Sequence, residues 1–163
     1  MNAEYLKSLI SYNKNTGEFK WKAKNKIKAG KTGWKDKDGY LHIRIDYKLY
    51  RAHRLAWLYV YGVFPDEAID HIDRNPSNNK IENLRLCNKR QNAINSKMRS
   101  DNTSGYRGVR RRPGMKKWQA RAYFEGKEVH LGYFDTAEEA SEVYKKKVIE
   151  LNGGYTESTQ WKI

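Results

Sequence analysis

The sequence contains only one cysteine, Cys87, among its 163 residues. A single cysteine can form neither an internal disulfide nor a zinc site with several cysteine ligands. Long apolar runs are also missing, because no stretch approaches the roughly 18 residues that cross a membrane. The first residues, MNAEYLKSLI, lack the apolar centre of a signal peptide. We therefore expect a cytoplasmic protein that has no membrane partner.

Acidic residues are scarce relative to basic ones. The chain has 33 Lys and Arg against 19 Asp and Glu, which gives a net charge of +14. The excess is spread over the whole chain, with +7 in residues 1–50, +3 in residues 51–98 and +4 in residues 99–163. Such an excess is typical of proteins that bind a polyanion, usually nucleic acid. A membrane surface fits less well, because the charge lies mostly in strand-like and turn-like segments rather than on an amphipathic helix.

The first half of the sequence predicts short strands and one helix. Hydrophobic residues are 38% of the chain and charged residues 32%, which favours small modules over one large core. Apolar and polar residues alternate in TGEFKWK and in GYLHIRIDYKLYRAH, so a small antiparallel sheet is expected within residues 1–50. RLAWLYVY, which is followed by Gly62, predicts a short buried helix.

Residues 68–86, AIDHIDRNPSNNKIENLRL, combine an Asp-His pair with a series of asparagines. IDHI predicts a strand, RNPSNN a loop, and ENLRL a second extended segment. From Asn88 onward, NKRQNAINSK predicts a helix with Asn88 as its N-cap, which places Asn92 one turn into the helix. The expected order is therefore strand, loop, strand and helix.

Polar residues 99–104 predict a linker to a C-terminal region, residues 105–163. Three short strands are expected there, with turns at Pro113-Gly114 and Glu125-Gly126. TAEEASEVYKKKVIELNGG then predicts a helix that begins with a capping box, ends at two glycines and covers the sheet with an apolar stripe.

The residues of the Asp-His window restrict which metals it can hold. An EF-hand calcium loop is excluded, because Asn78 stands where the loop requires glycine and Leu84 where it requires glutamate. The histidines and Cys87 lack the paired spacing of a zinc site. A carboxylate such as Asp70 suits Mg²⁺ or Mn²⁺, and an imidazole such as His71 titrates in the range of a general base.

Asp70 and His71 are adjacent on a predicted strand, so their side chains should point to opposite faces and cannot simply pair. Asn92 on the following helix could supply a second oxygen to a metal held by Asp70. Asn83 on the second extended segment could hold the His71 imidazole in one tautomer. From these residues alone, a structural Asp-His pair remains the alternative.

The segment DHIDRNPSNNKIENLRLCNKRQN resembles the HNH, or ββα-metal, nuclease motif of phage homing endonucleases. The shared pattern is Asp-His, an asparagine twelve residues after the histidine, and another asparagine nine residues further on. The resemblance implies that Asp70 and Asn92 bind the metal, that His71 is the general base and that Asn83 orients it. It also implies Mg²⁺ or Mn²⁺ without zinc, and hydrolysis of phosphodiester bonds in duplex DNA.

The same resemblance extends upstream, to KDGYLHIRIDYKLYRAHRLAWLYVYG. It implies that residues 51–98 form the HNH module and that residues 1–50 are its β-rich N-terminal region. His53 is then expected to be structural or to face DNA rather than to be catalytic. Arg85 and Arg90 are candidates to hold a phosphate, and solvated charges are the alternative.

The segment SGYRGVRRRPGMKKWQARAYFEGKEVHLGYFDTAEEASEVYKKKVIELNGG is similar to the AP2 domain of plant transcription factors. The shared signs are YRGVR, the central KW, LGYFDTAEEA and the final helix. AP2 domains lay a three-stranded sheet in the major groove, so the resemblance implies a base-reading antiparallel sheet packed on one helix. The candidate DNA-binding residues are Arg107, Arg110, Arg112, Trp118 and Arg121, with a core position as the alternative for Trp118.

Several positions depart from the plant pattern, so the plant target sequence is not expected. Gly114 stands in place of a tryptophan, Arg121 replaces a glutamate, Glu128 replaces an arginine and His130 replaces a tryptophan. The basic strands could also contact only phosphates, which would give affinity without sequence preference.

We therefore expect a monomeric α+β protein in which an HNH nuclease module is targeted by an AP2-type domain. The expected activity is metal-dependent, homing-type cleavage of duplex DNA. One alternative is a catalytically inactive, sequence-specific DNA-binding protein that regulates transcription. Another, a ribosome-associated RNA-binding protein, explains the charge but not the set of Asp70, His71, Asn83 and Asn92.

Overall fold

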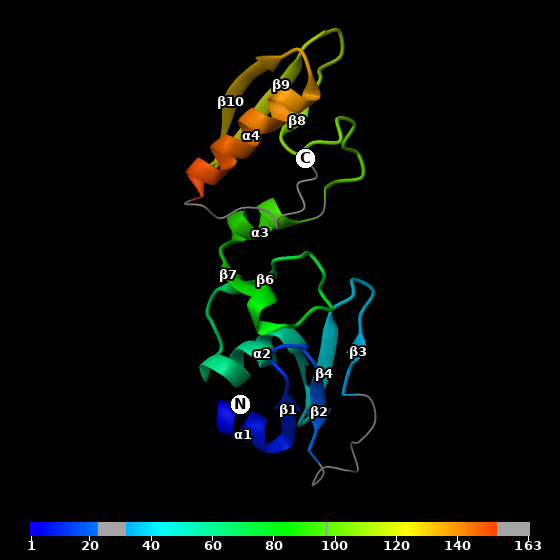
Figure 1. The fold of residues 1–163 in the computed structure, drawn as a ribbon, viewed down its shortest axis with the longest axis vertical. Helices are drawn as coiled ribbons and strands as arrows, with labels where there is room; N and C mark the ends of the chain where they lie inside the picture. The colour runs from blue at the N-terminus through cyan, green and yellow to red at the C-terminus, as the bar shows by residue number, and fades with distance from the viewer. Residues whose placement is uncertain (23–31, 97, 153–163) are drawn as a thin grey trace. The chain divides into compact units, whose positions relative to one another are not determined.

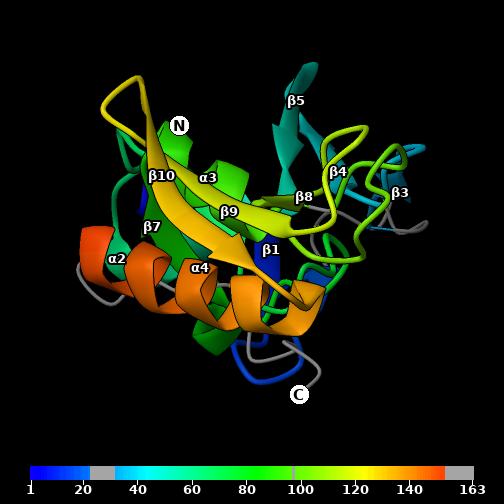
Figure 2. The ribbon, with the colours of Figure 1, turned by 90° about the horizontal axis from the view of Figure 1, so that it is seen from above.

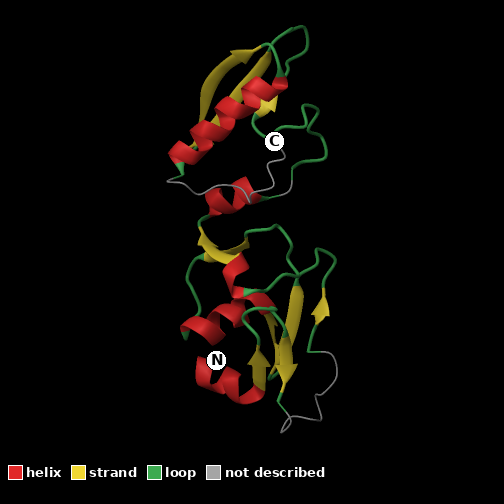
Figure 3. Ribbon diagram, viewed as in Figure 1, coloured by secondary structure: helices red, strands yellow, loops and turns green. Residues whose placement is uncertain are grey.

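A computed structural model describes residues 1–22, 32–96 and 98–152. Helices and strands are mixed along these residues, and the strands form small antiparallel sheets (Figures 1 and 3). The predicted α+β fold class is confirmed at this level. The described residues form two compact units, 1–95 and 96–152. No helix within the described ranges has the length and apolar character needed to cross a membrane.

The first unit begins with a helix and a strand that the sequence patterns did not predict, α1 (Ala3–Leu9) and β1 (Ile10–Tyr12). Asn2 caps the helix, because its Oδ1 accepts the Tyr5 backbone N–H at 2.9 Å. β1 pairs with β2 (Phe19–Trp21), which lies in the predicted TGEFKWK segment. The two strands form an antiparallel hairpin.

A three-stranded sheet follows in the order β3 (Trp34–Lys35), β4 (Leu41–Ile45) and β5 (Lys48–Arg51). Ile43 and Ile45 are buried, whereas Arg44 between them is exposed, as the alternating pattern predicts. Residues 23–31 of the predicted β-rich region lie outside the described residues.

Helix α2 (Ala52–Tyr61) contributes several residues to the core of the first unit. It ends at Gly62, whose φ of 84° closes the last turn in the left-handed conformation. Leu55 and Leu58 are buried in one core with residues of α1, β1, β2, β4 and β7, namely Leu6, Ile10, Phe19, Ile43, Ile45 and Leu84. Residues from both 1–50 and 51–98 therefore build the same core.

The Asp-His window folds in the predicted order of strand, loop, strand and helix. The elements are β6 (Ala68–His71), a single 3₁₀ turn η2 (Ile81–Asn83), β7 (Leu84–Cys87) and α3 (Lys89–Asn95). β6 and β7 pair antiparallel and place Asp70 opposite Arg85. Asn88 and Gln91 cap α3 reciprocally: each side-chain oxygen accepts the other residue's backbone N–H at 2.9 Å.

The second unit is a three-stranded antiparallel sheet covered on one face by α4 (Ala137–Leu151), as Figure 2 shows. Its strands are β8 (Val109–Arg110), β9 (Trp118–Phe124) and β10 (Lys127–Phe134), with β9 in the middle. Thr136 and Glu139 form the predicted capping box. Gly153 and Gly154, which were predicted to end the helix, lie outside the described residues.

Gly108 allows β8 and α4 to pack closely. Its φ is 70°, and a Cβ at this position would lie 2.2 Å from two ring carbons of Tyr144 on α4. The same Cβ would lie 2.7 Å from the Arg121 backbone oxygen. The glycine of the YRGVR motif is therefore required both by the backbone conformation and by the space beneath the helix.

We predict that Gly108→Ala destabilises the second unit by about 1 to 3 kcal/mol more than Gly114→Ala does. Gly114 is the matched control, because its φ is 80° and nothing lies within 4 Å of its Cβ position. Both variants suffer the same backbone strain, so the difference reports the contact with Tyr144. Urea unfolding of both variants measures the difference. Equal losses of stability would show that this contact relaxes without cost.

Candidate functional site

Strand β6 places Asp70 and His71 on opposite faces of the β6–β7 hairpin, because side chains alternate along a strand. Both side chains are nevertheless buried, at 7% and 5% exposure. Asp70 contacts Asn95 at the end of α3, whereas His71 lies against His53 of α2. Residues of α3 therefore cover the Asp70 side of the hairpin, and residues of α2 cover its His71 side.

The Asp70 carboxylate has a cation and an amide as partners. Arg85 Nε, directly across the hairpin, donates to Oδ2 at 3.0 Å. Asn95 Nδ2 lies 3.0 Å from Oδ1 and 2.9 Å from Oδ2, and it also donates to the His71 backbone oxygen at 2.8 Å. The acid is therefore held in a fixed orientation, and its charge is balanced by Arg85.

Asn95 is the asparagine of α3 that contacts Asp70, and Asn92 stays a predicted metal ligand. Asn92 is exposed on α3, whereas Asn95 is only 3% exposed. The Asn95 Oδ1 accepts from Arg74 Nε at 3.2 Å, which leaves Nδ2 to face the carboxylate. In this arrangement Asn95 positions Asp70 by donating to it.

Asn79 orients the His71 imidazole. His71 Nε2 lies 3.4 Å from Asn79 Oδ1, and Asn79 Nδ2 donates to the Ser77 backbone oxygen at 3.2 Å. The second bond fixes which end of the amide faces the ring. Because a carbonyl oxygen only accepts, Nε2 of the neutral imidazole carries the proton and Nδ1 is the basic nitrogen.

The imidazole of His71 is surrounded by other rings. The His53 ring is 5.0 Å away and perpendicular, and the Tyr40 ring is 5.9 Å away. Burial lowers the pKa of His71 below its ordinary value, although the hydrogen bond to Asn79 and the nearby carboxylates oppose the shift. Burial, together with His71 and the neighbouring arginines, lowers the pKa of His53 to about 3. Both imidazoles are therefore neutral at pH 7.

Asn83, the predicted orienting residue, closes the loop between the two strands. Its Nδ2 donates to Asp73 Oδ1 and to the Asn78 backbone oxygen, both at 2.9 Å. Its Oδ1 accepts the Asp73 backbone N–H at 3.0 Å. Asn83 thus acts on His71 indirectly, by shaping the loop that carries Asn79.

The N-terminal hairpin β1–β2 supports the same loop from the outside. The Tyr12 hydroxyl donates to the Asn79 backbone oxygen at 2.7 Å, and the Ile81 N–H donates to the Lys14 oxygen at 3.1 Å. Gly17 approaches so closely that a Cβ there would lie 2.6 Å from the Lys80 nitrogen. The hairpin and the loop are therefore packed backbone to backbone.

A divalent metal can be tested against these side chains by their chemistry. Among the described residues, no group of three or more His, Cys, Asp and Glu side chains is placed to share an ion. Asp70 and the exposed amide of Asn92 offer hard oxygen donors, and Mg²⁺ is often held by one or two carboxylates plus water and substrate phosphate. By donor chemistry these residues suit a hard divalent ion completed by water and phosphate, although Arg85 and Asn95 contact the Asp70 carboxylate in this structure.

The face of the second unit's sheet that α4 does not cover carries a polar network. Arg110 Nε donates to Gln119 Oε1 at 2.9 Å, and Gln119 Nε2 lies 2.9 Å from His130 Nδ1. These three residues come from β8, β9 and β10, so the network crosses the whole sheet. Gln119 is buried beneath the side chains on either side of it.

Glu128 on β10 joins two of the predicted DNA-binding arginines. Its Oε2 accepts from Arg121 at 2.6 Å and from the Tyr123 hydroxyl at 2.8 Å. Its Oε1 lies 3.7 Å from Arg110. Hydrogen bonds from Tyr123 and Arg121 lower the pKa of Glu128, so the carboxylate is ionised at pH 7. One acid therefore holds both guanidinium groups on the open face.

The remaining predicted residues lie at the ends of the strands or in loops. Trp118 is half buried against the core of the second unit, with the Arg111 guanidinium 5.0 Å above its ring. Arg107 precedes β8, and Arg112 is exposed in the loop after it. This loop lines an open pocket of about 550 Å³ that includes Arg111, Arg112 and Lys116. In the first unit, Arg90 is half buried on α3.

Sequence reasoning did not identify Asn79, Asn95 or Glu128 as site residues. Asn79 was interpreted as a turn residue, and its partner Tyr12 lies 67 residues away in the sequence. Asn95 lies three residues after Asn92, the separation at which two residues share a helix face. This spacing was the signal that could have identified Asn95. The signal for Glu128 was its position on the strand that pairs with the strand of Arg121.

Comparison with known proteins assigns the first unit. A family model described as HNH endonuclease matches residues 50–94. Protein 3.8 of Escherichia phage T7 is 34% identical over 110 residues, which cover 67% of this chain and 90% of that protein. A protein described as "Uncharacterized HNH endonuclease L560", from Acanthamoeba polyphaga mimivirus, is 29% identical over 156 residues, 91% of this chain and 77% of its own length.

No solved structure matches the chain. The HNH match spans β6, η2, β7 and most of α3, and therefore includes Asp70, His71, Asn83 and Asn92. The mimivirus match extends over most of the chain and therefore beyond this segment. The chain therefore belongs to the family of Protein 3.8 of phage T7, and its residues 50–94 match the HNH endonuclease family.

Proposed function

We propose that this protein is a metal-dependent endonuclease that hydrolyses phosphodiester bonds in duplex DNA, with His71 as the general base. The orientation of the His71 imidazole carries this proposal. Its Nε2 is engaged by Asn79 at 3.4 Å, which leaves Nδ1 as the nitrogen that can take a proton from water. The lowered pKa of His71 keeps the imidazole in the neutral form that a base requires.

Asp70 is the proposed metal ligand, with the amide oxygen of Asn92 as the second ligand and Asn95 as the residue that positions Asp70. A bound Mg²⁺ or Mn²⁺ would supply charge neutralisation at the scissile phosphate and its leaving oxygen. Asp70 and His71 are consecutive residues of β6, so the proposed metal ligand and the proposed base are neighbours along the chain. In-line displacement requires the attacking water to stand opposite the leaving oxygen, and a metal held by Asp70 would neutralise the charge on that oxygen.

The contact between Arg85 and Asp70 favours a second candidate function. Arg85 Nε lies 3.0 Å from Asp70 Oδ2, so a cation of the protein already neutralises the proposed metal ligand. A DNA-binding protein that has lost its nuclease activity would retain such an internal pair. The presence of His71, Asn83 and Asn92 together with Asp70 supports the enzyme instead, because a purely structural hairpin does not require this set.

The proposed cleavage is of the homing type, and the second unit is the proposed targeting module, of AP2 type. The open sheet face of this unit presents Arg110 and Arg121, which can donate in pairs to guanine edges in the major groove. Glu128 and Gln119 hold these arginines in place by hydrogen bonds. Arg111, Arg112 and Lys116 lie in one loop, where they are suited to contact phosphates.

Substitution of the base tests the nuclease reaction. We expect His71→Ala to lower the rate of plasmid cleavage in Mg²⁺ or Mn²⁺ by about a hundredfold to ten-thousandfold, because a general base contributes that much to the rate. Affinity for duplex DNA, measured in EDTA, should be unchanged. A His71→Ala protein that cuts as fast as the parent would falsify this mechanism. A parent that binds DNA but does not cut with either metal would support the inactive alternative.

The two proposed metal ligands predict a shared effect on metal binding. We expect Asp70→Asn and Asn92→Ala each to weaken Mn²⁺ binding, measured by calorimetry, by about tenfold or more. Half-maximal cleavage should require correspondingly more metal. Asn15→Ala, which changes an exposed asparagine in the β1–β2 turn, is the control and should bind Mn²⁺ like the parent. If only Asp70→Asn weakens binding, Asn92 is not a ligand.

Sequence preference tests the targeting module. The preferred site is first obtained by recovering cleaved or bound duplexes from a random library. We then expect Arg110→Ala to weaken binding to this site by about 1–3 kcal/mol while changing nonspecific binding much less. Lys146→Ala removes the same charge from the exposed side of α4, and it should weaken specific and nonspecific DNA binding slightly and to the same extent. Equal losses on all sequences for Arg110→Ala would reduce this arginine to a phosphate contact.

A further inference from the structure

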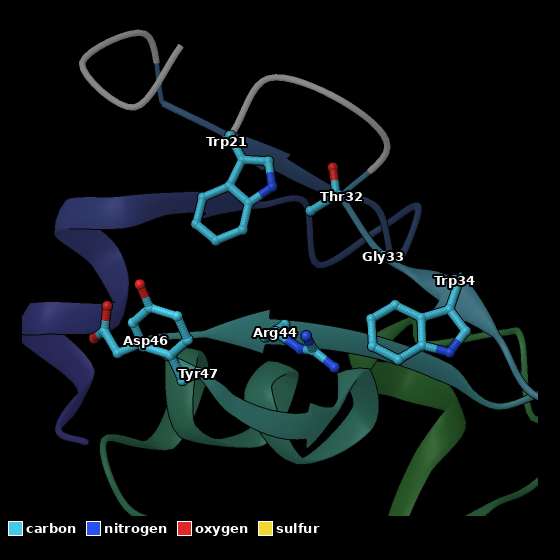
Figure 4. Close-up of a pocket in the computed structure, with 7 residues that line it drawn as sticks. All are labelled: Trp21, Thr32, Gly33, Trp34, Arg44, Asp46 and Tyr47. Atoms are coloured by element: carbon cyan, nitrogen blue, oxygen red, sulfur yellow. The ribbon is translucent and has the colours of Figure 1, made fainter. Parts of the chain in front are cut away.

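The first unit contains a pocket that lies apart from the Asp70 and His71 residues. It has a volume of about 350 Å³ and is lined by residues of β2, β3 and β4, of the segment just before β3 and of the β4–β5 turn, namely Trp21, Thr32, Gly33, Trp34, Arg44, Asp46 and Tyr47. Figure 4 shows the rings of Trp21, Trp34 and Tyr47 around this space, with the Arg44 guanidinium between Trp34 and Tyr47 in this view. Three aromatic rings and one cation therefore share a single open cavity.

Tyr47 has no structural reason to be aromatic. It is the second of two residues, after Asp46, that connect β4 to β5, and both have positive φ, 46° for Asp46 and 63° for Tyr47. Such two-residue turns favour asparagine and glycine, and a bulky side chain there is strained. Tyr47 is also 99% exposed, so no packing compensates for the strain. An exposed ring in a strained turn indicates a binding role.

Trp34 and Arg44 are arranged to receive a planar ligand. Trp34 is 46% exposed, although tryptophan is usually covered when it serves only the core. The Arg44 guanidinium carbon lies 5.8 Å from its ring centroid, which holds the cation beside the aromatic surface. Trp21 packs partly on the core and forms another wall.

A hydrogen-bonding group completes the pocket. The Tyr5 hydroxyl donates to Asp46 Oδ2 at 2.7 Å, which fixes the carboxylate at the pocket edge. A carboxylate can accept hydrogen bonds from the exocyclic amino group of a base. The pocket thus offers stacking surfaces, a cation for a phosphate and an acceptor for a base edge.

We propose that this pocket binds an unpaired nucleobase of a nucleic-acid strand. Aromatic side chains combined with arginine are the usual platform on which unpaired bases stack. A sugar or an apolar peptide could also contact tryptophan, but the net charge of +7 in residues 1–50 favours a polyanion. The site would be used wherever the strand is single or a base has left the duplex. Its existence does not depend on cleavage.

The test uses the full-length protein in EDTA, so that no strand is cut. Fluorescence anisotropy measures the affinity for a short single-stranded oligonucleotide, for the same strand with abasic sites in place of its bases, and for the duplex. Tyr47→Gly is the decisive variant, because glycine relieves the positive φ and the fold should be at least as stable. We expect it to weaken binding to the base-containing strand by about five- to a hundredfold, as loss of base stacking predicts.

Binding of the abasic strand and of the duplex should change less than twofold. Trp34→Ala should repeat the effect, whereas Tyr61→Ala, an exposed aromatic residue at the end of α2, should have none. The proposal is overturned if Tyr47→Gly affects the abasic strand equally, since the contact would then be to phosphate. It is also overturned if the parent protein does not bind the single strand. An unchanged affinity of Tyr47→Gly for the base-containing strand would overturn it as well, and would leave a sugar or a peptide as the ligand of the pocket. None of these results bears on His71 or on duplex cleavage.

Discussion

One buried hydrogen bond, from the Tyr12 hydroxyl to the Asn79 backbone oxygen, determines how the His71 imidazole is presented. Burial raises the pKa of Tyr12 to about 12, so the hydroxyl remains a donor at any working pH. Leaving such a buried acceptor without its donor costs about 1–3 kcal/mol. The segment that matches the HNH family, residues 50–94, does not include Tyr12. The N-terminal hairpin is therefore part of the site, because it holds the loop whose asparagine fixes the imidazole.

The electrostatics of the first unit depend on the same burial. His53 and His71 lie 5.0 Å apart between ring centroids, and two charged imidazoles at that distance would repel each other. Desolvation keeps both neutral, with the pKa of His53 at about 3. On the other face of β6, the Asp70 carboxylate lies 3.0 Å from the Arg85 guanidinium. The neutral His71 and the Asp70 carboxylate paired with Arg85 are thus consecutive residues whose side chains lie on opposite faces of β6.

Sequence patterns predicted the elements of this fold better than their side-chain contacts. Alternation and capping residues located β6, β7, α3, the three strands of the second unit and α4, because these signals are local. α1 and β1 were not predicted, since short elements owe their stability to tertiary packing. Asn95 rather than Asn92 contacts Asp70, and this depends on how closely the C-terminal end of α3 packs against β6. Asn79 was interpreted as a turn residue, because Tyr12 lies 67 residues away.

Two kinds of arginine follow from the geometry of the second unit. Arg110 and Arg121 share Glu128, so their guanidinium groups are fixed and their charge is partly cancelled. Arg111 and Arg112 lie in a loop with Lys116 and without such an acid among the residues that line their pocket. A compensated, oriented guanidinium gains little from an unspecific phosphate but can still donate to a base edge, whereas an uncompensated one attracts any phosphate. On the proposed function, sequence preference and general affinity therefore reside in different residues of one small sheet, and Glu128 separates them.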